Sequence, residues 1–289
     1  MRILTFIFVI LSLQGICQKT LYEDADSLNM LGTSILSSED HQTRIESSKK
    51  YTNSLKKILA SPDFDDKILE SVKNLSVQKE KDLAIYTWVV PSPDRASFVY
   101  HGIIKYRREN MHSIFELTDK SDSIMHPETT KTGPGKWYGA VYYKMIPRKK
   151  GKKKYYTLLG WKGNNASSTK KVIEILEMQG NTPVFGSPMI KTDQGLRHRI
   201  VFEYNAEASM SLHYYEKKSM IIFDHLSPPN AGLLGVYPTY GPDFSYDALI
   251  EKGNRWVLKK DILPENEDRK TKKFDPPQRG LMPQGNKKN

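Results

Sequence analysis

The stretch YGAVYYKMIPRKKGKKKYYTLLGW, residues 138–161, carries two aromatic-rich apolar segments on either side of a seven-residue run that contains six Lys or Arg. The segments 138–146 and 155–161 are rich in Tyr and other large side chains that favour β-strands. The link between them is too short for the crossover that a parallel pair needs, so the two strands pair antiparallel. We predict a β-hairpin whose like charges spread out in a long solvated loop.

The same pattern of short strands continues on both sides of this hairpin. The further strands that we expect are 83–90, 98–106, 113–117, 171–178, 183–190, 198–204, 209–215, 220–225, 246–250 and 255–258. Gly- or Asn-containing turns at 109–110, 179–181 and 251–254 link three of the pairs as hairpins. No helix-length segment alternates with these strands, which excludes a Rossmann fold or a βα-barrel. The pattern predicts a large antiparallel β-sheet, arranged as a sandwich or an open barrel.

Residues before this region have the spacing of amphipathic helices instead. One apolar face recurs every three or four residues at Leu21, Ala25, Leu28, Leu31 and Ile35. A second helix is expected over 45–59, and a third over 64–75, where Ser61-Pro62-Asp63 forms a typical helix start. The fold class is therefore α+β, with a helical N-terminal segment (18–78) packed on an antiparallel β domain (79–263).

The first seventeen residues have the layout of a secretory signal peptide. Arg2 precedes an apolar run from Ile3 to Leu13, and Gly15-Ile16-Cys17 resembles a cleavage site. The run is shorter than the roughly 20 residues that span a bilayer. We predict that residues 1–17 are a signal peptide and that the protein is exported, to the periplasm, the cell envelope or the medium. No transmembrane span is expected after the leader is removed.

Cys17 is the chain's single cysteine, so cleavage after it leaves a mature protein without thiols. The residues before it are Leu13-Gln14-Gly15-Ile16, and Gln14 and Ile16 do not fit a lipid-attachment motif. This argues against a lipid anchor at Cys17. At the other end, residues 264–289 are rich in Lys, Asn, Gln and Pro and too polar to bury a core. We predict that they form a disordered basic tail.

The formal net charge of +11 suggests anionic surroundings, such as a membrane surface or an acidic polysaccharide. The alternative is that basic loops only keep an exported protein soluble. Nucleic-acid binding is not expected, because the aromatic residues flank the basic run instead of interleaving with it. The seven His have no metal-ligand spacing, so we expect neither a metal site nor a cofactor. The expected partner is a glycan, a peptide or an envelope protein.

Two neighbouring residues are the best candidates for catalysis. Asp224 and His225 end an apolar strand, and Asp243 lies in the following loop. Adjacent strand residues point to opposite faces, so Asp224 and His225 do not form a catalytic pair by themselves. The sequence contains no G-x-S-x-G, H-E-x-x-H or phosphate-binding P-loop motif. A hydrolase is an alternative only if folding brings Asp224, His225 and Asp243 together.

Two loops carry aromatic and amide side chains suited to binding. One is rich in Tyr, Pro and Gly (235–243), and the other follows an aromatic strand end (161–165). The candidate binding residues are Trp161, Asn164, Asn165, Tyr237 and Tyr240. If both loops lie at one end of the sheet, they form a polar, aromatic-lined pocket. The alternative is ordinary turn chemistry, in which Asn and Gly only shape the chain.

Residues 137–262 resemble an exported protein family of Bacteroidota whose function is unassigned. The segments that carry the resemblance are 137–140, 156–161, 202–206, 223–226 and 240–243, together with the strand around 85–88. The resemblance implies export and lineage, but no activity and no catalytic residues. We therefore expect non-catalytic binding in the cell envelope. A hydrolase and a structural role in envelope assembly are the alternatives.

Overall fold

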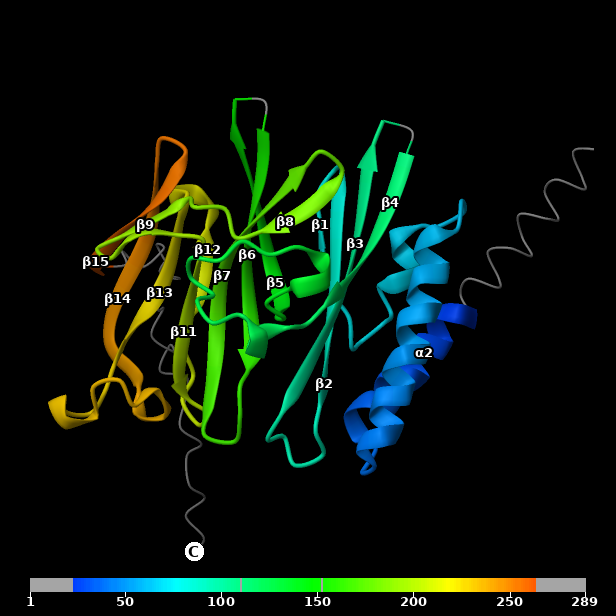
Figure 1. The fold of residues 1–289 in the computed structure, drawn as a ribbon, viewed down its shortest axis with the longest axis horizontal. Coiled ribbons are helices and arrows are strands. Elements are labelled where there is room, and N and C mark those ends of the chain that lie inside the picture. The colour runs from blue at the N-terminus through cyan, green and yellow to red at the C-terminus, as the bar shows by residue number, and fades with distance from the viewer. Residues whose placement is uncertain (1–22, 110, 152, 264–289) are drawn as a thin grey trace, which may run out of the picture.

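The structure is a computed structural model that describes residues 23–109, 111–151 and 153–263. The predicted signal peptide (1–17) and tail (264–289) lie outside the described residues. Helices cover one face of the first of three stacked sheets, so the chain is built in four layers, as Figure 1 shows. The predicted α+β class, with N-terminal helices and mostly antiparallel strands, is confirmed.

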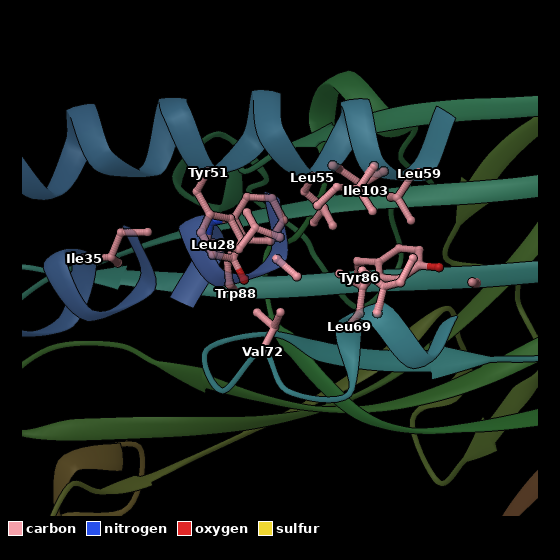
Figure 2. Close-up of a cluster of buried hydrophobic side chains, with 14 of the residues drawn as sticks. Leu28, Ile35, Tyr51, Leu55, Leu59, Leu69, Val72, Tyr86, Trp88 and Ile103 are labelled. Atoms are coloured by element: carbon pink, nitrogen blue, oxygen red, sulfur yellow. The ribbon is translucent and has the colours of Figure 1, made fainter. Parts of the chain in front are cut away.

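The helical layer consists of a helix over residues 23–37 and of α2 (His41–Ala60). The side chain of Asp40 caps α2 by accepting a hydrogen bond from Thr43 N at 2.7 Å. Apolar side chains of both helices pack on the first sheet, and Figure 2 shows this cluster. At its centre the rings of Tyr51 and Trp88 lie 5.1 Å apart.

The prediction of a third helix over residues 64–75 is wrong. Residues 64–75 contain only the 3-10 turn η1 (Asp66–Leu69), although their apolar side chains do pack into the helical core. The side chain of Asn29 accepts a hydrogen bond from Lys73 N and donates one to Ser71 O, each at 3.1 Å. Asn29 therefore satisfies two backbone groups of this segment, while internal hydrogen bonds of the 3-10 type, such as those from Ile68 N to Asp65 O and from Val72 N to Leu69 O, satisfy others.

The first sheet has the order β1-β2-β3-β4 and is antiparallel throughout. Its strands are β1 (Ser76–Lys79), β2 (Leu83–Pro91), β3 (Phe98–Arg108) and β4 (Met111–Thr118). Strand β2 is buried along almost its whole length, because one face meets the helices and the other meets the middle sheet. This explains why its sequence is continuously apolar and does not alternate.

The middle sheet has the order β11-β7-β6-β5, with β8 paired to β7. Its strands are β5 (Val141–Lys150), β6 (Lys153–Gly163), β7 (Ser168–Gln179), β8 (Thr182–Phe185) and β11 (Arg199–Asn205). One face packs on the first sheet and the other on the outer sheet. Strands β6 and β7 therefore lie in the centre of the molecule, as Figure 1 shows.

The outer sheet has the order β10-β9-β15-β14-β13-β12. Its strands are β9 (Ile190–Thr192), β10 (Gly195–Arg197), β12 (Leu212–Tyr215), β13 (Met220–Ser227), β14 (Gly241–Lys252) and β15 (Arg255–Ile262). Strands β9 and β15 pair in parallel, an exception to the antiparallel rule. Short 3-10 turns complete the fold: η2 (Ser121–Ser123), η3 (Pro134–Lys136), η4 (Glu216–Lys218), η5 (Ala231–Leu233) and η6 (Tyr237–Thr239).

The basic run does not form the long loop that we predicted. Strands β5 and β6 continue through it, so that Lys149 pairs in register with Lys154, and the chain turns at Gly151, whose φ is +59°. An ion pair between Lys154 and Asp82 offsets part of the repulsion between like charges. The continued ladder also gives the backbone regular hydrogen bonds, which a loop would leave to water.

A fully buried ion pair lies where the first sheet meets the middle sheet. Arg199 donates from Nε to Glu174 Oε1 at 2.7 Å, and neither side chain is exposed to solvent. The other oxygen of Glu174 accepts a hydrogen bond from the hydroxyl of Tyr142, which in turn accepts one from Trp137 Nε1 at 3.0 Å. Burial beside this carboxylate raises the pKa of Tyr142 well above its usual value.

This network also fixes neighbouring parts of the chain. The guanidinium of Arg199 donates to the carbonyl oxygens of Pro127 and Thr130, in the segment that links the first two sheets. Strand β5 has a bulge after Tyr142. The backbone of Tyr142 bonds to the first sheet: its N–H donates to Thr87 Oγ1 at 3.1 Å, and its carbonyl oxygen accepts a hydrogen bond from Ser76 Oγ. Tyr142 thus connects both sheets.

The close approach of Gly186 to this network can be tested by adding a methyl group. Gly186 has a φ of +87°, and a Cβ there would lie 2.8 Å from Thr130 O. Gly180 has a φ of +62° with nothing near its missing Cβ, so it is the matched control. We expect Gly180→Ala to cost about 1 kcal/mol of unfolding free energy and Gly186→Ala roughly 3 kcal/mol. Urea unfolding measures both losses, and equal losses would contradict this packing.

Candidate functional site

A cavity of about 350 Å³ opens where the beginning of β3 meets the ends of β4 and β6. Its lining combines two carboxylates, two hydroxyls, two amines, an amide and an aromatic ring. The lining residues are Phe98, Val99, Asp119, Lys120, Ser121, Asp122, Ser123, Lys162, Gly163 and Asn164. We call it the Lys162 cavity, after the buried cation in its wall.

The side chain of Lys162 is only 8% exposed, and its ammonium group makes several contacts with the protein. Its Nζ donates to Ser121 Oγ and to the carbonyl oxygen of Gly139, each at 2.9 Å. The rings of Tyr100 and Tyr138 also face the ammonium group, at 4.3 and 5.0 Å from their centroids. These contacts replace the water that the charge loses on burial.

Burial nevertheless changes the proton equilibrium of this amine. Loss of hydration lowers the pKa of Lys162 from 10.5 to about 8, although the charge of Asp119 opposes the shift. The carboxylate is near but not in hydrogen-bond contact, with Oδ2 3.9 Å from Nζ. Lys162 is therefore a charged donor at neutral pH that loses its proton in mildly alkaline solution.

Asp119 shapes the wall beside Lys162. Its Oδ1 accepts hydrogen bonds from Ser121 N at 3.0 Å and Gly139 N at 3.2 Å, and its Oδ2 accepts one from Tyr100 N at 3.2 Å. A Cβ at Gly139 would lie 2.5 Å from the Cβ of Tyr100, so a side chain does not fit there. The polar groups of the wall are thus fixed before any ligand arrives.

Trp161 lies next to the cavity. Its ring meets Phe98 edge to face, with centroids 5.7 Å apart, and Phe98 is itself a lining residue. The ring of Tyr100 is 6.5 Å away on another side. Trp161 is partly buried, whereas Trp88, Trp137 and Trp256 are at most 3% exposed. A change in the cavity therefore affects Trp161 through Phe98.

The two candidate amides have different surroundings. Asn164 lines the cavity, and its Nδ2 donates to Ser168 Oγ at 2.7 Å and to Glu203 Oε1 at 3.0 Å. Asn165 accepts hydrogen bonds from Ser167 N and Ser168 N, both at 2.9 Å. Asn165 therefore shapes the β6–β7 turn, which is the turn chemistry that we considered as the alternative.

The loop of Tyr237 and Tyr240 lies at the same end of the middle sheet as the turn 163–168. Asn205, which pairs with Ser168 at the end of β11, donates from its backbone N–H to Tyr240 O at 2.9 Å. The two tyrosine rings are 5.2 Å apart, and Tyr237 is 50% exposed. The two loops share one end of the sheet, but neither tyrosine lines the Lys162 cavity.

The catalytic candidates lie on the paired strands β13 and β14 of the outer sheet. Asp224 Oδ2 accepts a hydrogen bond from Ser211 N at 2.6 Å, and Asp243 Oδ1 accepts one from Ser245 Oγ at 2.7 Å. His225 lies at a bulge in β13, and its Nδ1 is 2.9 Å from Oδ2 of Asp247. Asp247, which the sequence predictions do not include, is the hydrogen-bond partner of the histidine.

The sequence predictions also omit Lys162, Asp119 and Ser121. One signal was present: Lys162 lies four and six residues after Leu158 and Tyr156, so period-two alternation places it on their face. That face is the one packed on the first sheet. Lysine is rarely buried unless it is paired, so a lysine on a buried strand face indicates a specific interaction.

Within the described residues, no three His, Cys, Asp or Glu side chains gather closely enough to hold a metal ion. None of the described helices is both long and apolar enough to cross a membrane. Comparison of the chain with protein-family models, with curated proteins and with solved structures finds no match. The resemblance to exported proteins of Bacteroidota therefore stays a prediction.

The lowered pKa of Lys162 predicts a pH-dependent contribution to stability. Between about pH 8 and 10.5 the folded chain has released the lysine proton while the unfolded chain still holds it. Unfolding then takes up a proton, so the unfolding free energy contributed by Lys162 rises with pH, by roughly 3 kcal/mol over this range. We expect the stability difference between the natural chain and Lys162→Met to grow accordingly in urea titrations.

The matched control is Lys120→Met, which removes an exposed lysine from the same cavity. Its stability difference from the natural chain should stay flat over the same pH range. A flat difference for Lys162→Met as well would show that burial does not perturb this amine.

Proposed function

We propose that this is an exported, non-catalytic binding protein whose ligand is a glycan held in the Lys162 cavity. The chemistry of the cavity lining carries the proposal. Sugar hydroxyls both donate and accept hydrogen bonds, and the cavity offers carboxylate acceptors at Asp119 and Asp122 and a donor at Lys162, which uses only two of its three protons within the protein. The ring of Phe98 adds the apolar surface on which a sugar face packs.

The fixed geometry of the wall is suited to binding. Lys162 already bonds Ser121 and Gly139, and Asp119 bonds three backbone N–H groups. Groups held in this way orient a ligand at little further cost in conformational entropy. The hydrolase alternative depends on His225, which lies on β13 of the outer sheet and does not line the cavity.

The other parts of the proposal come from the sequence. Export to the periplasm or envelope follows from the leader at residues 1–17, with secretion to the medium as the alternative. A peptide or an envelope protein is the alternative ligand class, for which Tyr237, half exposed beside Tyr240, offers a contact surface. A structural role in envelope assembly would use neither the cavity nor these rings.

The proposal can be tested with the fluorescence of Trp161 during titration with a glycan panel. We expect a saturable change in emission, because a sugar that packs on Phe98 alters the contact between Phe98 and Trp161. The variant Trp161→Phe should still bind the same glycan in calorimetry but lose the optical signal. The absence of any response across a broad panel, in fluorescence and in calorimetry, would contradict the proposal.

A variant pair then assigns binding to this cavity. Asp122 is an exposed lining residue, and Asp122→Asn removes a charged acceptor for sugar hydroxyls without disturbing the core. We expect its dissociation constant for the glycan to rise at least about tenfold. Asp63→Asn, at an exposed position outside the cavity, is the charge-matched control and should bind normally. Equal affinity of the two variants would place the site elsewhere.

A further inference from the structure

The opposite end of β6 borders a second hollow. A groove of about 440 Å³ lies between the β1–β2 turn, the base of the β5–β6 hairpin and β14. Its lining is dominated by long charged side chains: Glu80, Lys81, Asp82, Pro147, Arg148, Lys149, Lys154, Tyr156 and Glu251. The β5–β6 and β14–β15 hairpins end on this side of the molecule, at the top of Figure 1. We call it the basic groove.

The basic groove continues past the β1–β2 turn. A neighbouring hollow of about 210 Å³ shares Glu80, Lys81 and Asp82 with it, so these residues form a boundary common to both. The neighbouring hollow adds three further cations, Lys79, Lys105 and Arg107. Together the two hollows make a path across this end of the sheets that is lined by seven Lys or Arg and four Asp or Glu.

Most carboxylates along the path are already neutralised by the protein. Asp82 pairs with Lys154, Asp66 with Lys79, and Glu251 with Arg148 at 3.0 Å. Lys81 and Lys149 are exposed, and neither has a carboxylate within ion-pair distance among the described residues. Together with Arg107, which is also exposed, these two lysines are charges that an external anion finds available.

Arg148, which lines the basic groove, is held in place before any ligand arrives. The guanidinium of Arg148 lies 4.7 Å from the ring centroid of Trp256 and 5.7 Å from that of Tyr214, besides its ion pair with Glu251. Its buried Nε has no hydrogen-bond partner within the part of the chain that the structure describes. Next to it Lys149 and Lys154 stand directly opposite each other on paired strands. Their mutual repulsion is relieved when an anion lies between them.

We propose that the basic groove binds an acidic polysaccharide, a linear chain of carboxylate-bearing sugars, with Lys81 and Lys149 contacting successive carboxylates. Two adjoining hollows with shared lining residues fit a polymer strand, whereas an anionic bilayer presents a broad surface. Exposed Pro147 supplies an apolar contact for a sugar ring. Single-stranded nucleic acid needs exposed rings for stacking, and Tyr156, the aromatic residue of the lining, is only 3% exposed.

The test uses the purified full chain and de-esterified oligogalacturonate as the probe, with calorimetry at 50 and 200 mM NaCl. We expect saturable binding that weakens as salt rises, because screening acts on exposed charges. The double variant Lys81→Gln/Lys149→Gln should bind about tenfold more weakly at the lower salt concentration. The control Lys49→Gln/Lys50→Gln removes the same charge from exposed positions on α2 and should bind like the natural chain.

Several results would overturn the inference. They are no binding at the lower salt concentration, equal weakening by the groove variant and its control, or tighter binding to phosphatidylglycerol vesicles or to oligo(dT) than to oligogalacturonate. The groove lies at the other end of β6 from the Lys162 cavity, so its ligand should leave Trp161 emission unchanged. Asp122→Asn should likewise keep its affinity for oligogalacturonate, so this inference and the proposed function fail independently.

Discussion

The course of the segment that links the first two sheets depends on the buried ion pair between Arg199 and Glu174, which both belong to the middle sheet. Burying two charges costs several kcal/mol for each ion, and only good geometry with further hydrogen bonds offsets that cost. Here the hydroxyl of Tyr142 and the carbonyl oxygens of Pro127 and Thr130 supply those bonds. The chain between the two sheets is thereby held on the middle sheet, with Asp119 at its start and Gly139 near its end.

Both candidate functional surfaces follow from this arrangement. The middle sheet is buried on both faces, so only its ends are available for binding. One end of β6 carries Lys162, whose ammonium group reaches the Gly139 carbonyl of the connecting segment. The other end carries Lys154 beside the basic groove. A stiff sheet thus places a small polar cavity and a charged groove at opposite ends, where polar side chains remain in contact with water.

Much of the fold could be predicted because strand patterns and turn residues are local. The hairpin turns at Gly180 and Gly253, both with positive φ, appear directly in the sequence. The third predicted helix is reduced to one 3-10 turn, after which the side chain of Asn29, far away in sequence, holds the backbone of Ser71 and Lys73. The stacking of three sheets and the candidate site depend on contacts between distant strands, such as Asp119 with Lys162. A single sequence gives no spacing rule for such contacts, so the pair was missed.

The most direct test of this account is a double-mutant cycle on Arg199 and Glu174, followed by urea unfolding. Arg199→Met leaves a buried carboxylate unpaired and Glu174→Leu leaves a buried guanidinium unpaired, so we expect each to lose about 3–5 kcal/mol of unfolding free energy. The double variant removes both charges and should lose no more than either single variant. Single losses below about 1 kcal/mol, or a double loss equal to the sum of the two, would contradict the central role of this pair.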